Sequence, residues 1–241
     1  MGRGLPQEVI EKAMQEVSLD DSLRFECKRC GQCCFRCEIV LTPYDILRLC
    51  QGVRITTGEF LDYYGQITLG PESGLPVCWL DFEKVQWWRG GDEESPPCPF
   101  LTLEGERFAC GIYPYRPSCC RSFPVFRMAE ADEEPKFYLQ EVSCPAAETD
   151  RAYTVAEWMA HEGLAAYHRE NDRFLTQVMI LTRAREARSE AFLQLLAGLW
   201  YDYSRLKEGE TLGEKYEEAM QAAAQLIDAV INRSVISGEE S

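Results

Sequence analysis

The fold of this 241-residue chain has to accommodate twelve cysteines, all of which lie within its first 144 residues. Four of them form the run Cys27-x-x-Cys30-x-x-Cys33-Cys34. A Cys-x-x-Cys pair lets two sulfurs converge on one metal ion with little strain, and the third cysteine repeats the same spacing. The run therefore predicts a metal site in the first part of the chain.

The adjacent cysteines Cys33 and Cys34 indicate more than one centre. Neighbouring side chains diverge by about 100° on a helix and point to opposite faces of a strand. These two are therefore not expected to serve one mononuclear ion together with Cys27 and Cys30. We expect two centres, or one cluster and a separate site.

More cysteines follow where turns and the ends of β-hairpins are expected. They are Cys98, Cys110, the adjacent pair Cys119 and Cys120, and Cys144. Backbone N–H groups in such turns can hydrogen-bond a thiolate sulfur and tune it. Arg116 and Arg121 flank the adjacent pair, so they can offset thiolate charge.

These cysteines stand in four ordered blocks that resemble a known family. The blocks are Cys27-x-x-Cys30-x-x-Cys33-Cys34, Cys98-Pro99-Phe100-Leu101, Cys110-x-Ile112-Tyr113-x-x-Arg116-Pro117-x-x-Cys120-Arg121-x-Phe123-Pro124 and Cys144-Pro145. Over residues 25–146 the chain resembles the YkgJ-type cysteine-cluster family, whose members are described as zinc- or iron-chelating proteins.

The resemblance implies a set of eight metal ligands. They are Cys27, Cys30, Cys33, Cys34, Cys98, Cys110, Cys120 and Cys144. It selects Cys120 rather than Cys119, because the family pattern places the cysteine directly before an arginine. Four cysteines fall outside the pattern, and we interpret them as small buried hydrophobic residues or incidental thiols: Cys37, Cys50, Cys78 and Cys119.

The donor set leaves two metals open. Eight thiolates carry the same net charge of about −4 with two Zn²⁺ ions or with two [4Fe–4S]²⁺ clusters, so charge does not decide. The repeated x₂ spacing and the absence of histidine from this region favour an iron–sulfur cluster, with [4Fe–4S] first. Structural zinc more often uses two separated Cys-x₂-Cys pairs or mixed cysteine and histidine ligands.

Three functions are compatible with such a centre. The first is an iron–sulfur protein in electron transfer, redox sensing or a cofactor role. The second is structural zinc that folds a protein-interaction module. The third comes from a further resemblance to flagellin lysine-N-methylase, which implies a cluster-dependent protein-modifying enzyme. In that enzyme Tyr113, Arg116 and Arg121 would orient an anionic co-substrate beside the cluster.

The charge balance argues against two classes of partner. Asp and Glu number 40 against 25 Lys and Arg, which gives a net charge of −15. Such a chain repels phosphate backbones and anionic membranes, and its apolar runs are too short to span a bilayer. We expect a cytoplasmic protein that binds metal ions, with neither nucleic acid nor membrane as partner. A protein partner would bind through the helical region.

The remaining pattern predicts an α+β fold in two domains. Residues 1–148 should form a Cys-rich, metal-organised region of short helices and β-hairpins, with hairpins over 100–109 and 123–142. Residues 149–241 should form an antiparallel helical bundle. An apolar stripe over 6–17 predicts a helix before the first cysteine.

Capping signals and histidines complete the expectations for the helical part. Thr154 and Glu157 form a capping box, and a second helix is expected after Asn171-Asp172. The two histidines, His161 and His168, are seven residues apart. Seven residues correspond to about 10.5 Å along a helix, which is too far for a shared mononuclear site.

Overall fold

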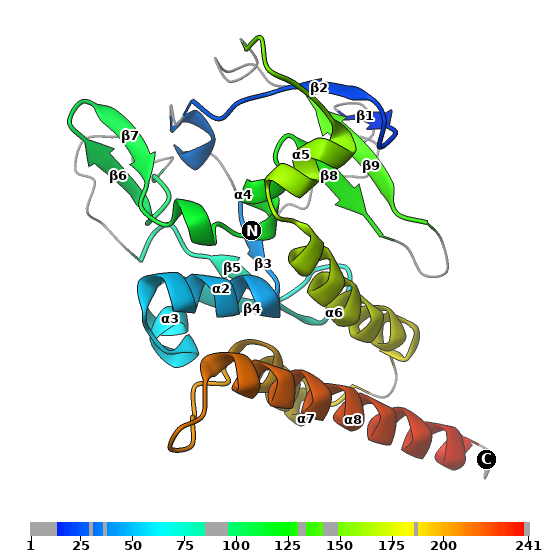
Figure 1. Ribbon diagram of the computed structural model, residues 1–241. Helices are drawn as coiled ribbons and strands as arrows, with labels where there is room; N and C mark the ends of the chain where they lie inside the picture. Colours follow the sequence, from blue (N-terminus) through cyan, green and yellow to red (C-terminus); the bar gives the residue numbers. More distant parts are fainter. Residues whose placement is uncertain are drawn as a thin grey trace. The chain divides into compact units, whose positions relative to one another are not determined.

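Short strands and short helices make up the first part of the described chain, which ends in four successive helices. The computed structural model in Figure 1 describes residues 14–28, 31–35, 38–84, 96–129, 134–141, 149–185 and 188–238. Its helices and small antiparallel sheets make the protein α+β with a helical C-terminal region, so the predicted fold class is confirmed.

Contacts divide the described residues into two compact units. The first unit comprises the described residues up to 35 together with 96–169, and the second comprises 38–84 and 170–238. Each unit draws on residues from both sides of position 148. The predicted domains, 1–148 and 149–241, therefore do not coincide with these units. The division into these two domains stays a prediction.

Small antiparallel sheets build the described part of the first unit. One sheet has the order β1 (Met14–Val17), β9 (Lys136–Gln140) and β8 (Val125–Met128). A second pairs β2 (Ser22–Arg24) with β10 (Ala152–Thr154), and a third pairs β6 (Leu101–Glu104) with β7 (Arg107–Cys110). The two hairpins expected from the sequence are confirmed as β6–β7 and β8–β9.

The N-terminal helix expected over 6–17 is wrong where the structure describes it. Residues 14–17 form strand β1, which pairs antiparallel with β9 from Val17 opposite Phe137 to Met14 opposite Gln140. Residues 6–13 lie outside the described residues. Pairing with a distant strand satisfies the backbone here and overrides a weak helical pattern.

Short helices position the cysteine-bearing turns of the first unit. They are η1 (Gln32–Phe35), η2 (Tyr113–Tyr115), α4 (Ser118–Ser122) and α5 (Val155–His161). The predicted capping box at the start of α5 is confirmed, because the Thr154 side chain accepts from the Glu157 N–H and the Glu157 carboxylate accepts from the Thr154 N–H. A core of Leu23, Phe25, Val125, Val155 and Trp158 lies beneath these elements.

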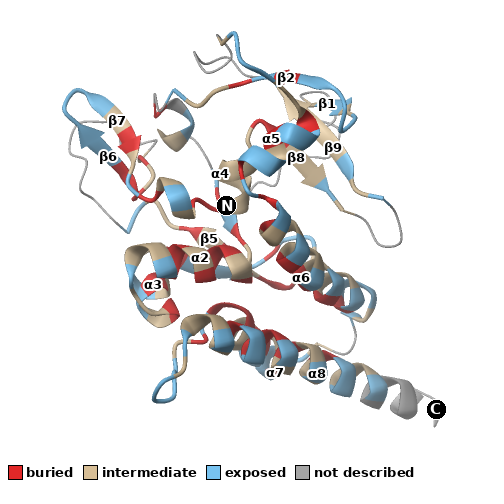
Figure 2. Cartoon of the chain, in the orientation of Figure 1, coloured by how far each residue is buried: buried red, intermediate tan, exposed pale blue. Residues whose placement is uncertain are grey.

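The second unit combines a small sheet with long helices. Its sheet has the order β3 (Val40–Leu41), β5 (Pro76–Leu80) and β4 (Gly65–Leu69). Its helices are α2 (Pro43–Val53), α3 (Thr57–Tyr63), α7 (Glu190–Tyr201), α8 (Leu212–Gly238) and most of α6 (Ala165–Arg183). Figure 2 shows the buried positions of α2, which include Ile46 and Leu49.

Buried aromatic side chains tie distant segments of the second unit together. The Tyr203 hydroxyl donates to the Pro43 carbonyl at 2.9 Å. The Trp200 indole N–H donates to Gln177 Oε1 at 2.8 Å, so this buried amide and indole satisfy each other. These bonds fix α2, α6 and the end of α7 within one core.

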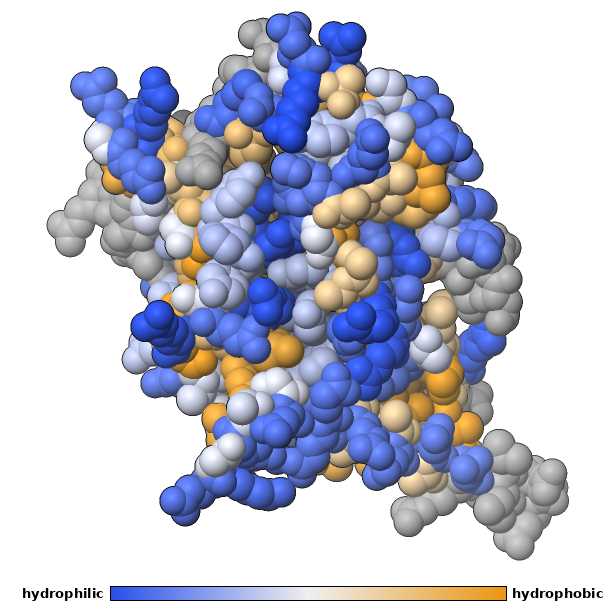
Figure 3. Space-filling model, in the orientation of Figure 1, coloured by the Kyte–Doolittle hydropathy of each residue, from blue (hydrophilic) through white to orange (hydrophobic). Residues whose placement is uncertain are grey.

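The helix predicted to begin after Asn171-Asp172 starts earlier. Helix α6 runs without interruption through these two residues, from Ala165 to Arg183. The break falls instead at Gly163, which has a φ of +65° that favours glycine. No helix in the described part of the chain is long and apolar enough to cross a membrane. The face of the protein in Figure 3 is mostly hydrophilic.

Candidate metal centre

Helix η1 presents the two adjacent cysteines of the first run. It follows Gly31, which has a φ of +77° and would bring an added Cβ within 3.0 Å of the Phe108 ring. The Phe35 ring packs edge-on against Phe108 at 5.3 Å between centroids. The glycine and the aromatic pair therefore seat the run against strand β7.

The thiols of Cys33 and Cys34 face each other. A hydrogen bond between them lowers the pKa of Cys33 to about 7 and raises the pKa of Cys34. The expectation that these side chains diverge is wrong, because each thiol can rotate about its Cα–Cβ bond toward its neighbour. The number of metal centres stays a prediction.

Cys98 and Cys110 lie beside this pair. The Cys98 N–H donates to the Cys34 carbonyl at 2.6 Å, and the Cys98 carbonyl accepts from the Leu101 N–H at 2.9 Å. In the β6–β7 hairpin Leu101 lies opposite Cys110, so both cysteines occupy the same end of the hairpin. After the hydrogen bond to Cys33 and burial, the negative charges of Cys33, Cys98 and Cys110 raise the pKa of Cys34 further.

Helix α4 adds Cys120 to the same neighbourhood. A hydrogen bond with Cys119 raises the pKa of Cys120, and burial and the charges of Cys119 and Cys33 raise it further. Burial raises the pKa of Cys110, and the charges of Cys120 and Cys27 add to this effect against a hydrogen bond from the Ile112 N–H. The mutual effects link thiols from three separate segments of the chain.

Six of the eight predicted ligands lie in the described part of the first unit, and each either alters the pKa of another thiol or has its own pKa altered by one. They are Cys27, Cys33, Cys34, Cys98, Cys110 and Cys120. Cys30 and Cys144 lie outside the described residues. Among the described residues, no three cysteine, histidine, aspartate or glutamate side chains are already close enough to hold one ion. The described thiols are neighbours, but their arrangement is not that of a coordination shell.

A buried arginine lies among these thiols. Arg116 Nη2 is 2.7 Å from Glu162 Oε2, and the two side chains are only 10% and 7% exposed. Arg116 also donates from Nε to the Tyr113 carbonyl at 3.2 Å and from Nη1 to the Cys120 carbonyl at 3.4 Å. Its positive charge adds to the hydrogen bond with Cys34 that lowers the pKa of Cys33, and it opposes the larger effects that raise the pKa of Cys120.

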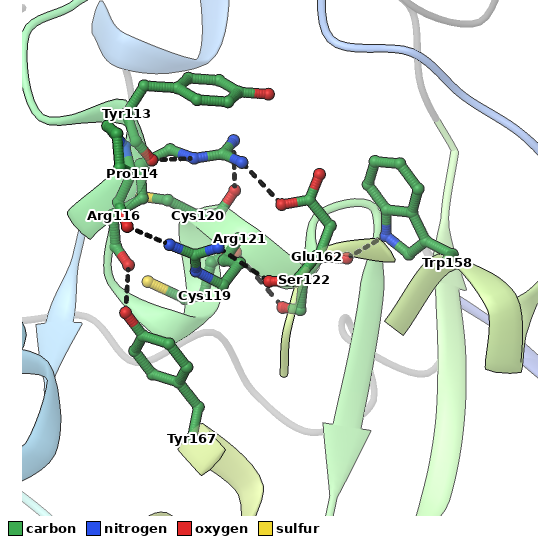
Figure 4. A network of polar contacts seen from close by, with 10 residues as sticks. All are labelled: Tyr113, Pro114, Arg116, Cys119, Cys120, Arg121, Ser122, Trp158, Glu162 and Tyr167. Atoms are coloured by element: carbon green, nitrogen blue, oxygen red, sulfur yellow. Dashed lines mark hydrogen bonds and ion pairs between the residues drawn. The ribbon is translucent and has the colours of Figure 1, made fainter. Parts of the chain in front are cut away.

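A second arginine anchors the same turn. Arg121 donates to the Glu162 carbonyl at 2.7 Å and to the Pro114 carbonyl at 2.6 Å. The Trp158 indole N–H donates to the Ser122 carbonyl at 3.1 Å. Figure 4 shows both arginines reaching toward Glu162, so long-range contacts hold the turn that carries Cys120.

The residues predicted to orient a co-substrate have internal partners. The Arg116 guanidinium carbon lies 3.7 Å from the centre of the Tyr113 ring, and Arg121 stacks over Tyr167 at 5.2 Å. These contacts give Tyr113, Arg116 and Arg121 a role in building the site. Their role toward an anionic co-substrate stays a prediction.

The cysteines outside the family pattern fall into different places. Cys50 and Cys78 are buried in the second unit, where burial raises the pKa of each thiol to about 12. They pack there as small hydrophobic residues, as interpreted from the sequence. Cys119 instead lies against Cys120 in the first unit, and Cys37 lies outside the described residues.

The donor set fits a cation that prefers sulfur. Raised pKa values keep the thiols of Cys34, Cys110 and Cys120 protonated when no cation is present. A bound metal replaces those protons and compensates the thiolate charges that oppose one another here. Iron and zinc both meet this requirement.

Sequence reasoning did not find Glu162, Trp158 or Tyr167 as parts of this site. The Tyr167 hydroxyl donates to the Arg116 carbonyl at 3.3 Å, which adds a third contact from the segment after residue 154. The capping box at Thr154 predicts that a helix begins there but not what the helix touches. No local pattern connects these residues with a cysteine turn about 40 residues earlier.

Comparison with known proteins identifies the segment that carries the cysteines. A model of the CxxCxxCC family, described as "Putative zinc- or iron-chelating domain", matches residues 26–145. That segment contains all eight predicted ligands. Neither a search of curated proteins nor a search of solved structures gave a match. The resemblance seen in the sequence is confirmed, and over residues 26–145 the chain belongs to the CxxCxxCC family of zinc- or iron-chelating domains.

Proposed function

We propose that the chain holds an iron–sulfur cluster, with [4Fe–4S] favoured, in a redox, electron-transfer or cofactor role. The ligands would come from the eight family positions: Cys27, Cys30, Cys33, Cys34, Cys98, Cys110, Cys120 and Cys144. The observation that supports the proposal is the proximity of thiols from distant segments. The Cys98 N–H donates to the Cys34 carbonyl at 2.6 Å, and the charges of Cys33, Cys98 and Cys110 act on the pKa of Cys34.

The choice of iron–sulfur rests on the kind and spacing of the donors. Residues 26–145 contain no histidine, so sulfur is the donor that this domain offers in quantity. Three cysteines at successive x₂ spacing are typical of ferredoxin-like ligand runs. Arg116 supplies a buried positive charge beside an anionic centre, and such charges influence the reduction potential of a cluster.

A bound cluster would supply single-electron chemistry, and the chain would supply its surroundings. Partial burial of Cys120 would limit the access of water to its thiol. Backbone N–H groups in the same turns, such as that of Ile112 toward Cys110, donate to sulfur and stabilise its thiolate form. Thiolate centres persist in reducing compartments, which is why we propose a cytoplasmic location.

Anaerobic purification followed by spectroscopy tests this function. We expect a brown protein with visible charge-transfer absorbance and, after reduction, an electron paramagnetic resonance signal of an iron–sulfur centre. A Cys50→Ser variant is the matched control, because Cys50 lies in the second unit and should leave the spectra unchanged. A colourless wild-type protein without iron would contradict the proposal.

Structural zinc is the second candidate, and the family description favours it equally because it names zinc beside iron. A colourless protein with stoichiometric zinc would support a zinc-folded module that binds a protein partner through its helices. The third prediction, a cluster-dependent protein-modifying enzyme, requires a substrate screen with the loaded protein. Turnover of a protein substrate only when the cluster is present would support it.

A further inference from the structure

Glu162 lies beyond the end of the matched domain at residue 145, and yet it is the ion-pair partner of Arg116. The two charged atoms are 2.7 Å apart, and both side chains are about nine-tenths buried. A buried ion pair adds little net stability, because removing two charges from water costs about as much as their attraction returns. Stability alone therefore does not account for a charged pair at this position.

The guanidinium of Arg116 is held on several sides. Besides the bond to Glu162, it donates to the Tyr113 and Cys120 carbonyls and stacks on the Tyr113 ring at 3.7 Å. Figure 4 shows the group enclosed between Tyr113, the Cys120 turn and Glu162. Because each of its three nitrogens donates to a different partner, the guanidinium is held in one orientation.

One of the predicted ligands lies directly beside this charge. Arg116 Nη1 donates to the Cys120 carbonyl at 3.4 Å, so the guanidinium lies next to the turn that carries the Cys120 thiol. That thiol has to become a thiolate when a metal binds. If the thiolates of the metal-bound centre carry more negative charge than the metal carries positive charge, the centre is anionic. The positive charge of Arg116 would then stabilise it.

We infer that Glu162 tunes Arg116, the fixed positive charge of the thiolate centre, by cancelling part of that charge. The inference rests on the proposed metal-binding function and adds to it a residue outside the matched domain. The Tyr113 and Cys120 carbonyls and the Tyr113 ring also hold the guanidinium, so the main effect of Glu162 is on its charge. Arg116 and Glu162 therefore act on metal affinity in opposite directions.

The opposite directions can be measured with Zn²⁺ as the probe on the full-length, metal-free chain. Competition with a chelator at neutral pH gives the affinity for the wild type, Arg116→Gln, Glu162→Gln and the double variant. We expect Arg116→Gln to bind more weakly by about 10- to 100-fold, the usual effect of losing an outer-shell partner. Glu162→Gln should bind more tightly than the wild type, and the double variant should lie between the single variants.

Two results would overturn the inference. If both single substitutions weaken binding to a similar extent, the ion pair is a mechanical clamp without an electrostatic role. If neither substitution changes the affinity, the pair does not act on the centre. Glu162→Asp keeps the carboxylate but draws it back, so its affinity should fall between those of the wild type and Glu162→Gln. This variant decides the question if Glu162→Gln does not fold.

Glu170 in the second unit provides a matched control. Its side chain is 5% exposed and pairs with Arg173 at 2.6 Å, so Glu170→Gln also breaks an ion pair with a buried carboxylate. We expect lower thermal stability and unchanged zinc affinity. A shift equal to that of Glu162→Gln would overturn the inference. A wild-type chain that binds no zinc would also overturn the inference. The proposed function fails by a different result, which is a purified wild-type chain without iron.

Discussion

At the scale of single residues, Cys120 is the thiol with the most demanding surroundings. It is half-buried, hydrogen-bonded to Cys119 and close enough to Cys33 and Arg116 to respond to their charges. We predict that Cys120→Ser lowers metal affinity by more than the roughly 10- to 100-fold typical of an outer-shell loss. Metal analysis of the purified variant checks this, with an unchanged metal content as the contradictory result.

Cys50→Ser is the companion prediction for a cysteine outside the family pattern. Cys50 is 1% exposed in the second unit, where its thiol donates to the Thr56 carbonyl at 3.7 Å. The substitution should leave metal content nearly unchanged and lower the melting temperature, because it places a hydroxyl in an apolar site. Substantial metal loss in this variant would mean that our ligand set is wrong.

The motif predicted which cysteines to examine but not how their side chains meet. Spacing and family resemblance singled out Cys33 and Cys34, whereas the thiol–thiol hydrogen bond depends on rotation about side-chain bonds, which spacing does not report. Arg116 was expected beside thiolates because of its place in the motif. Its partner Glu162 could not be expected, because the contact spans 46 residues.

Among the elements, helix α5 carries Trp158 and leads to Glu162, and a capping box fixes where this helix begins. Thr154 Oγ1 accepts from the Glu157 N–H at 3.1 Å, and the Glu157 carboxylate accepts from the Thr154 N–H at 2.8 Å. Thr154→Ala removes one half of this box and should lower the free energy of unfolding by about 1 kcal/mol. Chemical denaturation measures the change.

Thr154→Ser is the control for this capping prediction. Serine keeps the oxygen that accepts from the Glu157 N–H, so its stability should stay close to that of the wild type. Equal losses in Thr154→Ser and Thr154→Ala would show that the methyl group matters and the cap does not.

Elements with strong local signals were predictable, and those that depend on distant partners were not. The capping box at Thr154 begins a helix, as the sequence predicts, and Thr42 and Thr56 begin α2 and α3 in the same way. Strand β1 depends instead on pairing with β9, which is about 120 residues away in the chain. A short apolar stripe cannot reveal such a partner.

At the scale of the whole molecule, the matched family domain depends on residues that follow it. Strand β10 pairs with β2, with Ala152 opposite Arg24, and Trp158 belongs to the same core as Phe25. We predict that a chain ending at residue 148 loses metal affinity and unfolds at a lower temperature, because it lacks this strand, Trp158 and Glu162. Metal analysis and calorimetry of the fragment test this.

A fragment of residues 1–148 that binds metal as well as the full chain would contradict this prediction and support the boundary expected from the sequence. That boundary follows the change from cysteine-rich to helical sequence. The compact units follow pairings such as Tyr203 with Pro43, which join segments 160 residues apart. Local composition does not show which distant segments of the chain contact each other.

Iron, zinc and acid-labile sulfide in anaerobically purified full-length protein show which centre the cysteines hold. We expect bound iron with inorganic sulfide, held by thiols that become reactive only after the metal is removed. A freshly purified chain without iron would contradict the iron–sulfur proposal, and a chain with neither iron nor zinc, whose cysteines are freely reactive or joined as cystines, would contradict metal binding altogether.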